Sequence, residues 1–305
     1  MVRLAAVSVD LDEIPNYFAI HGLPPPQGDA AHAVYDVALS RLDALARAHE
    51  LPLTLFAIGA DTARKQNAAA LRAMAESGHE IASHTLDHRY DLTRLSRAEM
   101  ARQVRAAADV LEGATGQRPA GFRAPGYTVT DDLFSVLSAE GVLYDSSVFP
   151  CPPYYLAKAA AMTAIRLRGR ASRSILDTPQ VLRAPRRPYR VGRPYWQRGR
   201  GVLELPIQVT RGPRLPFIGT TLTLAGADRA RWLTRMVLGE PLVNLELHGI
   251  DVLDESDGLT ALRPHQPDVR VATPVKLDAL GAVLTLLRRE GYHFVRLDEA
   301  ARAFA

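Results

Sequence analysis

The sequence is poor in cysteine and in long hydrophobic runs. Its single cysteine, Cys151, excludes an intrachain disulfide and a zinc site built from several thiolates. No run of eighteen apolar residues exists that could form a spanning helix, and the opening stretch "MVRLAAVSVDLDE" fits no signal peptide. We therefore expect a cytoplasmic protein, with 47% hydrophobic and 23% charged residues as in a globular domain.

Acidic residues are scarce in one segment. Between Cys151 and Leu203 the only acid is Asp177, whereas the segment holds Lys158 and eleven arginines. We treat 1–305 as a single domain with a basic, Arg/Pro-rich insert at about 151–203. Its stretch 154–170 could form an amphipathic helix, and the insert could rest on an anionic membrane surface or form a solvated lid. It carries no nucleic-acid-binding motif, so we expect no nucleic acid partner.

Short apolar runs alternate with helical patterns along the rest of the chain. Strands are predicted at 4–10, 53–59, 79–85, 119–127, 202–209, 241–249 and 293–297, and helices at 33–49, 66–78, 96–116, 130–141, 228–239 and 274–291, with Thr130 as an N-cap. Some seven strands that alternate with helices favour a parallel barrel or a doubly wound sheet. Polar residues fall at the carboxyl ends of the strands, which favours the barrel because every strand of a barrel opens onto one mouth.

Two stretches are candidates for a metal site. In "SVDLDE", Asp10 and Asp12 point the same way if the strand persists, and "HEIASHTLDH" places His84 and His88 four residues apart. One carboxylate and two imidazoles make a three-ligand site with open positions, as in catalytic zinc centres. The alternatives are a polar strand end and a polar loop.

Two further stretches are candidates for catalytic groups. "GFRAPGY" supplies Arg123, which could pair the acid that does not bind metal, and a turn that could aim backbone N–H groups at an oxyanion; it could also be a surface turn. "NLELHGID" places His248 at the end of a strand, in a structural or a catalytic role.

Five stretches follow one another in the order "SVDLDE", "HEIASHTLDH", "GFRAPGY", "YDSSVFP" and "NLELHGID". Together they resemble the polysaccharide deacetylase family of metal-dependent amidohydrolases, and the resemblance runs from about residue 4 to about residue 298. The resemblance implies a distorted (β/α)7 barrel and one divalent metal ion, with Zn²⁺ favoured. It implies these roles, residue by residue: Asp10 as general base, Asp12, His84 and His88 as metal ligands, Arg123 as partner of the base, His248 as general acid, Asp145 as its orienting acid, and Gly126 and Tyr127 at the oxyanion turn.

The chain departs from the family pattern at several of these positions. Leu11 separates the two aspartates, so Glu13 competes with Asp12 as a ligand. Gly126 stands where a tyrosine is usual, and the tryptophan often found after the fourth stretch is missing, so Asp251 is an alternative partner for His248.

The Asp-x-Asp form resembles cytoplasmic members, including lipid-linked aminoarabinose deformylases. We expect hydrolysis of an N-acetyl or N-formyl group from an amino sugar, which is a cell-envelope glycan or a lipid-linked precursor. Peripheral contact with the inner membrane face is a further expectation. The alternatives are an allantoinase-like hydrolase of a small amide and a non-catalytic carbohydrate-binding barrel.

Overall fold

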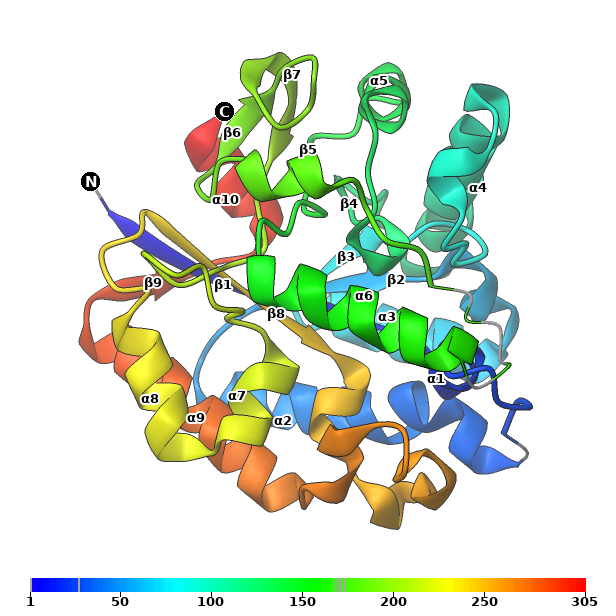
Figure 1. The fold of residues 1–305 in the computed structure, drawn as a ribbon, viewed down its shortest axis with the longest axis vertical. Helices are drawn as coiled ribbons and strands as arrows, with labels where there is room; N and C mark the ends of the chain where they lie inside the picture. The colour runs from blue at the N-terminus through cyan, green and yellow to red at the C-terminus, as the bar shows by residue number, and fades with distance from the viewer. Residues whose placement is uncertain (1, 27, 168, 170–171, 173) are drawn as a thin grey trace.

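A single twisted sheet organises the molecule (Figure 1). The computed structural model describes residues 2–26, 28–167, 169, 172 and 174–305. In those residues the strands run in the order β6-β7-β5-β4-β3-β2-β1-β8, with β9 paired to the start of β1. Their bounds are β1 Arg3–Asp10, β2 Leu53–Ala57, β3 Glu80–Ser83, β4 Gly121–Phe122, β5 Tyr144–Asp145, β6 Tyr189–Val191, β7 Arg198–Glu204, β8 Leu242–His248 and β9 Tyr292–Phe294.

The helices surround this sheet (Figure 1). Their bounds are α1 Ile14–Ile20, α2 Leu39–Ala48, α3 Lys65–Glu76, α4 Arg97–Thr115, α5 Asp131–Ala139, α6 Pro152–Leu167, α7 Gly219–Ala225, α8 Ala227–Arg235, α9 Thr273–Arg289 and α10 Leu297–Phe304. Within the described residues no helix is long and apolar enough to cross a membrane.

The helix ends follow local sequence signals. Ser96 caps α4 by accepting from the backbone N–H of Glu99, and α4 ends at Gly116 in the left-handed conformation. The predicted cap of α5 is confirmed, since Thr130 Oγ1 accepts from Leu133 N at 3.2 Å.

Irregular chain after β7 closes the sheet towards a barrel. Leu205 N donates to Asp145 O of β5, and Gln208 N donates to Asn244 O of β8. Asn244 Nδ2 also donates to Leu205 O. The predicted distorted (β/α)7 barrel is confirmed, with one side completed by this segment instead of a regular strand.

Helix α10 closes the amino-terminal end of the barrel. Leu297, Ala300 and Ala301 are buried there, and Leu297 N donates to Thr54 Oγ1 at the start of β2. Because this end is sealed, a site can open only at the carboxyl ends of the strands. The predicted strand 293–297 is therefore too long, because β9 ends at Phe294 and Leu297 already begins α10.

The basic insert contributes α6 and the antiparallel pair β6 and β7. Its amphipathic helix was predicted at 154–170, and α6 ends at Leu167; Arg168, Arg170 and Arg173 lie outside the described residues. Helix α6 crosses the carboxyl ends of the strands (Figure 1). The strand predicted at 202–209 ends at Glu204, where the closing segment begins.

Candidate active site

Asp12, His84 and His88 converge just beyond the ends of β1 and β3. Asp12 Oδ1 lies 3.3 Å from His84 Nε2 and 3.1 Å from His88 Nε2, and all three side chains are buried. His84 Nδ1 lies 2.8 Å from Arg123 O, which turns Nε2 towards Asp12. Thr85 and His88 both have positive φ, and Thr85 Oγ1 accepts from His88 N, so the loop bends sharply to bring the second imidazole back.

These three residues fit a divalent cation. Among the described residues, Asp12 Oδ1 and both ring nitrogens of His88 are buried without a hydrogen-bond partner. Burial opposes ionisation of Asp12, but His88 and His84 hold its pKa well below the usual value. A buried carboxylate facing two imidazoles with unused lone pairs is the donor set of a three-residue catalytic metal site.

Glu13 does not join this cluster. Its Oε1 lies 3.2 Å from His32 Nδ1, and burial together with Asp61 raises the pKa of Glu13 to about 8. The structure therefore favours Asp12 over Glu13 as the carboxylate that faces the histidines.

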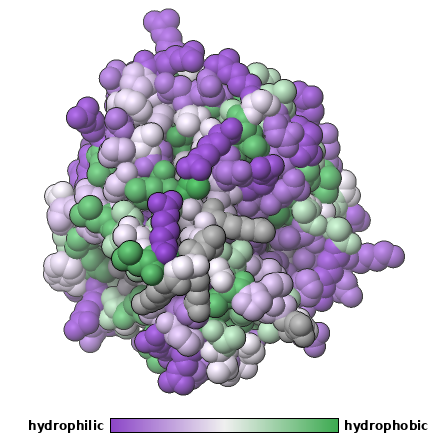
Figure 2. Space-filling model, turned by 45° about the vertical axis from the view of Figure 1, so that its right-hand side comes forward, coloured by the Kyte–Doolittle hydropathy of each residue, from purple (hydrophilic) through white to green (hydrophobic). Residues whose placement is uncertain are grey.

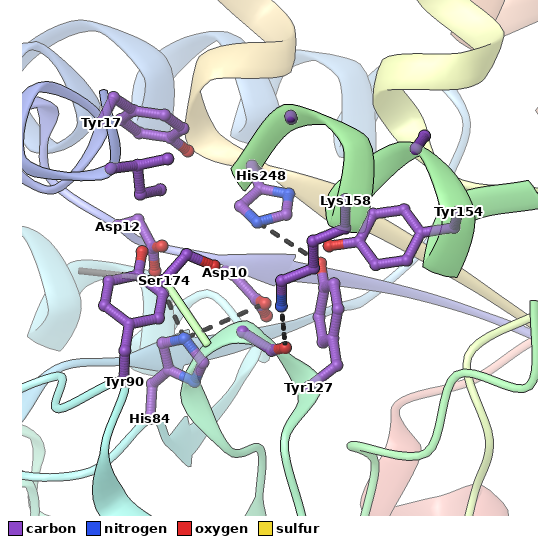
Figure 3. Close-up of a pocket in the computed structure, with 14 residues that line it drawn as sticks. Asp10, Asp12, Tyr17, His84, Tyr90, Tyr127, Tyr154, Lys158, Ser174 and His248 are labelled. Carbon is purple, nitrogen blue, oxygen red and sulfur yellow. Dashed lines mark hydrogen bonds and ion pairs between the residues drawn. The ribbon is translucent and has the colours of Figure 1, made fainter. Parts of the chain in front are cut away.

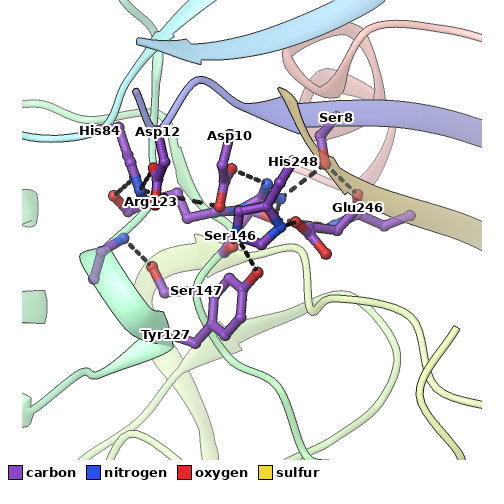
Figure 4. A network of polar contacts seen from close by, with 12 residues as sticks. Ser8, Asp10, Asp12, His84, Arg123, Tyr127, Ser146, Ser147, Glu246 and His248 are labelled. Carbon is purple, nitrogen blue, oxygen red and sulfur yellow. Dashed lines mark hydrogen bonds and ion pairs between the residues drawn. The ribbon is translucent and has the colours of Figure 1, made fainter. Parts of the chain in front are cut away.

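Asp10 is held by Arg123 across the barrel (Figure 4). Arg123 Nη1 donates to Asp10 Oδ1 at 2.6 Å, and Nη2 donates to Ser8 Oγ and Ser146 Oγ. The guanidinium also lies 4.0 Å from the centre of the Phe56 ring, and both charged groups are buried. Arg123 thus pairs Asp10, the aspartate outside the Asp12, His84 and His88 cluster, and it fixes the direction of that carboxylate.

His248 lies at the end of β8 and is paired with Glu246 on the same strand. His248 Nδ1 lies 2.8 Å from Glu246 Oε1, and Nε2 lies 3.4 Å from the Tyr127 hydroxyl. Burial lowers the pKa of His248, but the Glu246 carboxylate outweighs it and raises that pKa well above the usual value. The imidazolium is thus stabilised with Nε2 turned to the pocket.

Asp145 does not orient His248, so that prediction is wrong. Its carboxylate accepts from Ser147 N at 3.0 Å and from Ser147 Oγ at 2.8 Å, and Ser147 Oγ in turn accepts from Ala124 N. Asp145 is directed to the turn after Arg123 because the β4 and β5 ends are adjacent. Asp251, the alternative, accepts from His248 N at 2.8 Å and so holds the backbone and not the ring.

Sequence reasoning missed Glu246. The signal was available, since residues two apart on a strand share a face and Glu246 and His248 stand in that relation. An acid inside an otherwise apolar strand could have been read as the partner of the histidine.

The turn at 124–127 lies at the pocket, where its backbone N–H groups could donate to an oxyanion, but one of these groups is already used. Tyr127 N already donates to Ala124 O at 3.0 Å, which leaves the Gly126 N–H as the turn's candidate oxyanion donor. The prediction is corrected for Tyr127, whose hydroxyl near His248 is the group that faces the pocket. Gly126 has φ +64°, and a Cβ there would meet the Tyr90 ring at 3.0 Å, so glycine suits this turn.

One pocket of about 320 Å³ brings these groups together (Figure 3). The volume suits a small ligand or one end of a larger one. Beyond the predicted residues, tyrosines and one face of α6 form the wall. The additional lining residues are Tyr17, Ile20, Tyr90, Tyr154, Ala157, Lys158, Ala161 and Ser174.

Comparison with known proteins gives a matching family model and a matching fold. Residues 31–144 match the family described as polysaccharide deacetylase, a range that contains His84, His88 and Arg123. A peptidoglycan deacetylase-like protein of Gibberella zeae is 33% identical over 111 residues, which cover 36% of this chain and 32% of that protein. A chitooligosaccharide deacetylase of Bradyrhizobium sp. is 34% identical over 102 residues, which cover 33% of this chain and 45% of that protein. The matches thus span less than half the length of either relative.

Solved structures show the same fold across nearly the whole chain. The Xyl-CE4 domain of a multidomain xylanase from the hindgut metagenome of Trinervitermes trinervoides has a TM-score of 0.52 at 12% identity, covering 99% of this chain and 91% of that one. A CE4 family pseudoenzyme from Bacillus anthracis has a TM-score of 0.52 at 13% identity, covering 98% of this chain and 66% of that one. Identities this low establish the fold alone.

Proposed function

Because this chain belongs to the polysaccharide deacetylase family, we propose that it is a metal-dependent hydrolase that removes an N-acetyl group from an amino sugar. The observation that carries the proposal is the meeting in one pocket of Asp10 held by Arg123, the Asp12 cluster and His248 paired with Glu246. The match to the family covers residues 31–144 and leaves out Asp10, Asp12 and His248, so the roles of these three residues rest on this geometry.

Asp12, His84 and His88 would hold one divalent cation, with Zn²⁺ the best fit to one carboxylate and two imidazoles. Bound there, the cation would act as a Lewis acid that polarises the amide carbonyl and lowers the pKa of water.

Asp10 is suited to act as the base. Its Oδ1 is held by Arg123, and its Oδ2 lies 4.0 Å from His84 Nε2, on the side of the histidine cluster. The carboxylate would accept a proton as water adds to the carbonyl carbon, and the Gly126 N–H would donate to the carbonyl oxygen as charge develops on it.

His248 is suited to act as the acid. Glu246 raises the pKa of His248, which favours the protonated ring, and Nε2 faces the pocket that contains Asp10. The ring would donate a proton to the amide nitrogen as the C–N bond breaks, which releases acetate and the free amino sugar. An amine leaves poorly unless it is protonated, so the acid is as necessary as the base.

Amino-sugar glycans are the substrate class suggested by the names of the two relatives, a peptidoglycan deacetylase-like protein and a chitooligosaccharide deacetylase. A formyl group fits the same chemistry, and so does the allantoinase-like hydrolysis of a small amide. The occupied base, acid and ligand positions speak against a non-catalytic barrel.

Acetate release from N-acetylated chitooligosaccharides by the Zn²⁺-reconstituted protein tests the proposal, with formate release from N-formyl analogues and hydrolysis of small cyclic amides measured in parallel. Asp10→Asn should lower kcat by about 10²- to 10⁴-fold. Asp132→Asn, an exposed aspartate on α5, is the matched control and should leave activity unchanged. Failure of the wild-type protein to hydrolyse any of these amides would reject the proposal.

Membrane contact and a cytoplasmic location stay predictions. Leu156 and Leu167 of α6 are 67% and 84% exposed, which favours membrane contact. The face seen in Figure 2 is largely hydrophilic with small, separate hydrophobic patches, which does not favour it. Flotation with anionic liposomes at low salt tests the contact; protein that stays at the bottom of the gradient would exclude it.

A further inference from the structure

Helix α6 forms the outer wall of the pocket with one face. Tyr154, Ala157, Lys158 and Ala161 line the pocket, and their spacing of three and four residues places them on a single side of the helix. The lid that was one of the two predictions for the basic insert is thus present as α6. Two of the four residues are alanines, so Lys158 and Tyr154 supply the polar groups of this wall (Figure 3).

Among the described residues, the hydrogen-bond partner of the Lys158 ammonium group is a backbone carbonyl, since Nζ donates to Gly126 O at 2.9 Å. Asp177 lines a neighbouring cavity together with Lys158 and forms no salt bridge with it. Burial lowers the pKa of Lys158 to about 8, an effect that Asp177 only partly offsets. An ammonium group has three donors, so two remain for a ligand.

The acids of the pocket are already engaged. Asp10 is paired with Arg123, and Asp12 faces His84 and His88. A largely buried cation that no carboxylate contacts directly is costly, and an anionic group that enters the pocket would relieve that cost.

Two buried tyrosine hydroxyls from outside α6 also belong to the pocket, one from α1 and one from the loop after β3. The Tyr17 and Tyr90 side chains are 5% and 8% exposed, both line the pocket, and neither hydroxyl has a hydrogen-bond partner among the described residues. Unsatisfied hydroxyls in a pocket that also holds a cation suit a ligand that is rich in hydroxyls and carries a negative charge.

We propose that Lys158 is a substrate-recognition residue, and that the preferred substrate is an N-acylated amino sugar with a carboxylate or a phosphate on the sugar. This rests on the proposed function, and it narrows the substrate class of the same pocket. Carboxylate and phosphate share the chemistry that an ammonium group recognises, and the arms of the experiment separate them.

A purely structural role for Lys158 predicts something different. If Lys158 only linked α6 to the turn at Gly126, its replacement would weaken the binding of neutral and anionic sugars equally. If Lys158 binds an anion, its replacement would weaken the binding of the anionic sugars and leave the binding of the neutral sugar unchanged.

Calorimetric binding of four sugars to the metal-loaded protein tests the proposal: N-acetylglucosamine, its 1-phosphate, its 6-phosphate and N-acetylmuramic acid. We expect at least one anionic sugar to bind about ten- to a hundredfold more tightly than the neutral sugar. Lys158→Met should abolish this preference and Lys158→Arg should keep most of it. Arg166→Met, an exposed cation in the last turn of α6, is the matched control and should change nothing.

Equal binding of neutral and anionic sugars by the wild-type protein would overturn the proposal, and so would a Lys158→Met protein that keeps the preference. If Lys158→Met does not fold, the salt dependence of wild-type binding decides. A preference that falls as salt rises from about 0.05 to 0.5 M supports the proposal, and one that is independent of salt overturns it.

Acetate release on the same samples separates the two claims. Hydrolysis without a preference for anionic sugars would reject the role of Lys158 and keep the deacetylase. Lys158-dependent binding of anionic sugars without hydrolysis would keep the recognition site and reject the deacetylase.

Discussion

Glu246 Oε1 lies 2.8 Å from His248 Nδ1, and the two residues are neighbours on one face of β8. The acid and its partner therefore come from a single strand and move together. Glu246 is fully buried, so its charge acts on the imidazole with little screening by water. Glu246 is thus the carboxylate that contributes most to the raised pKa of His248, with smaller contributions from Asp10 and Asp12.

Glu246→Gln should lower kcat by about ten- to a hundredfold, because a neutral amide holds the imidazolium less well. Glu246 raises the pKa of His248, so the protonated ring persists to higher pH and activity is lost as pH rises through that pKa. In the variant this alkaline loss should occur at lower pH. A kcat against pH profile checks it; an unchanged alkaline limb would exclude Glu246 as the group that tunes His248.

The same pair predicts the pH dependence of stability. The pKa of His248 is higher in the folded protein than in the unfolded chain. The pair with Glu246 therefore stabilises the folded state fully below the pKa of the unfolded chain, about 6.5, and this stabilisation is lost as pH rises through the pKa of the folded protein. The difference in unfolding free energy between wild type and Glu246→Gln should therefore shrink as pH rises. Urea unfolding at a series of pH values measures it; a difference that grows with pH would contradict the account.

Arg123→Met should destabilise the protein by about 3 to 5 kcal/mol, because it leaves the buried Asp10 carboxylate without its partner. Adding Asp10→Asn should recover part of that loss, since it removes the uncompensated charge. Arg118→Met breaks exposed pairs with Asp109 and Glu112 and is the control, with little expected effect. Urea unfolding of the wild-type protein and these variants measures the differences. A double variant no more stable than Arg123→Met would contradict the pairing of Arg123 with Asp10.

Replacement of two glycines by alanine should change the stability of the protein in opposite directions. A Cβ on Gly121 of β4 would lie 2.0 Å from the Tyr144 ring, whereas one on Gly113 of α4 meets nothing within 4 Å. Gly121→Ala should cost about 1 to 3 kcal/mol through overpacking, and Gly113→Ala should add about 0.5 to 1 kcal/mol through helix propensity. Thermal unfolding compares the two, and equal effects would contradict the packing described at β4.

Much of the fold and the site could be predicted because the signals are local. Helix α4 has a cap, a periodic face and a terminal glycine, and the Asp12, His84 and His88 stretches carry their chemistry in their own residue types. The partners of side chains depend instead on which strand ends are adjacent. Asp145 therefore could not be directed to Ser147 from sequence. The pattern at 202–209 predicts one strand, but the irregular pairing after Glu204 depends on β5 and β8, which lie far away in the sequence.

The same limit applies to the insert. Its composition predicts an amphipathic helix, but the place of Lys158 above the strand ends follows only from how α6 packs across the mouth. A basic composition could not distinguish a surface patch from a pocket wall.

The most direct test is acetate release by the metal-stripped protein as Zn²⁺ is added in steps. The account predicts almost no activity at the start and a rise that saturates at about one equivalent per chain, and no such rise in the Asp12→Ala or His84→Ala protein. Activity that is full without metal, or that rises equally in the two variants, would contradict the assignment of Asp12, His84 and His88 as the metal site of a deacetylase.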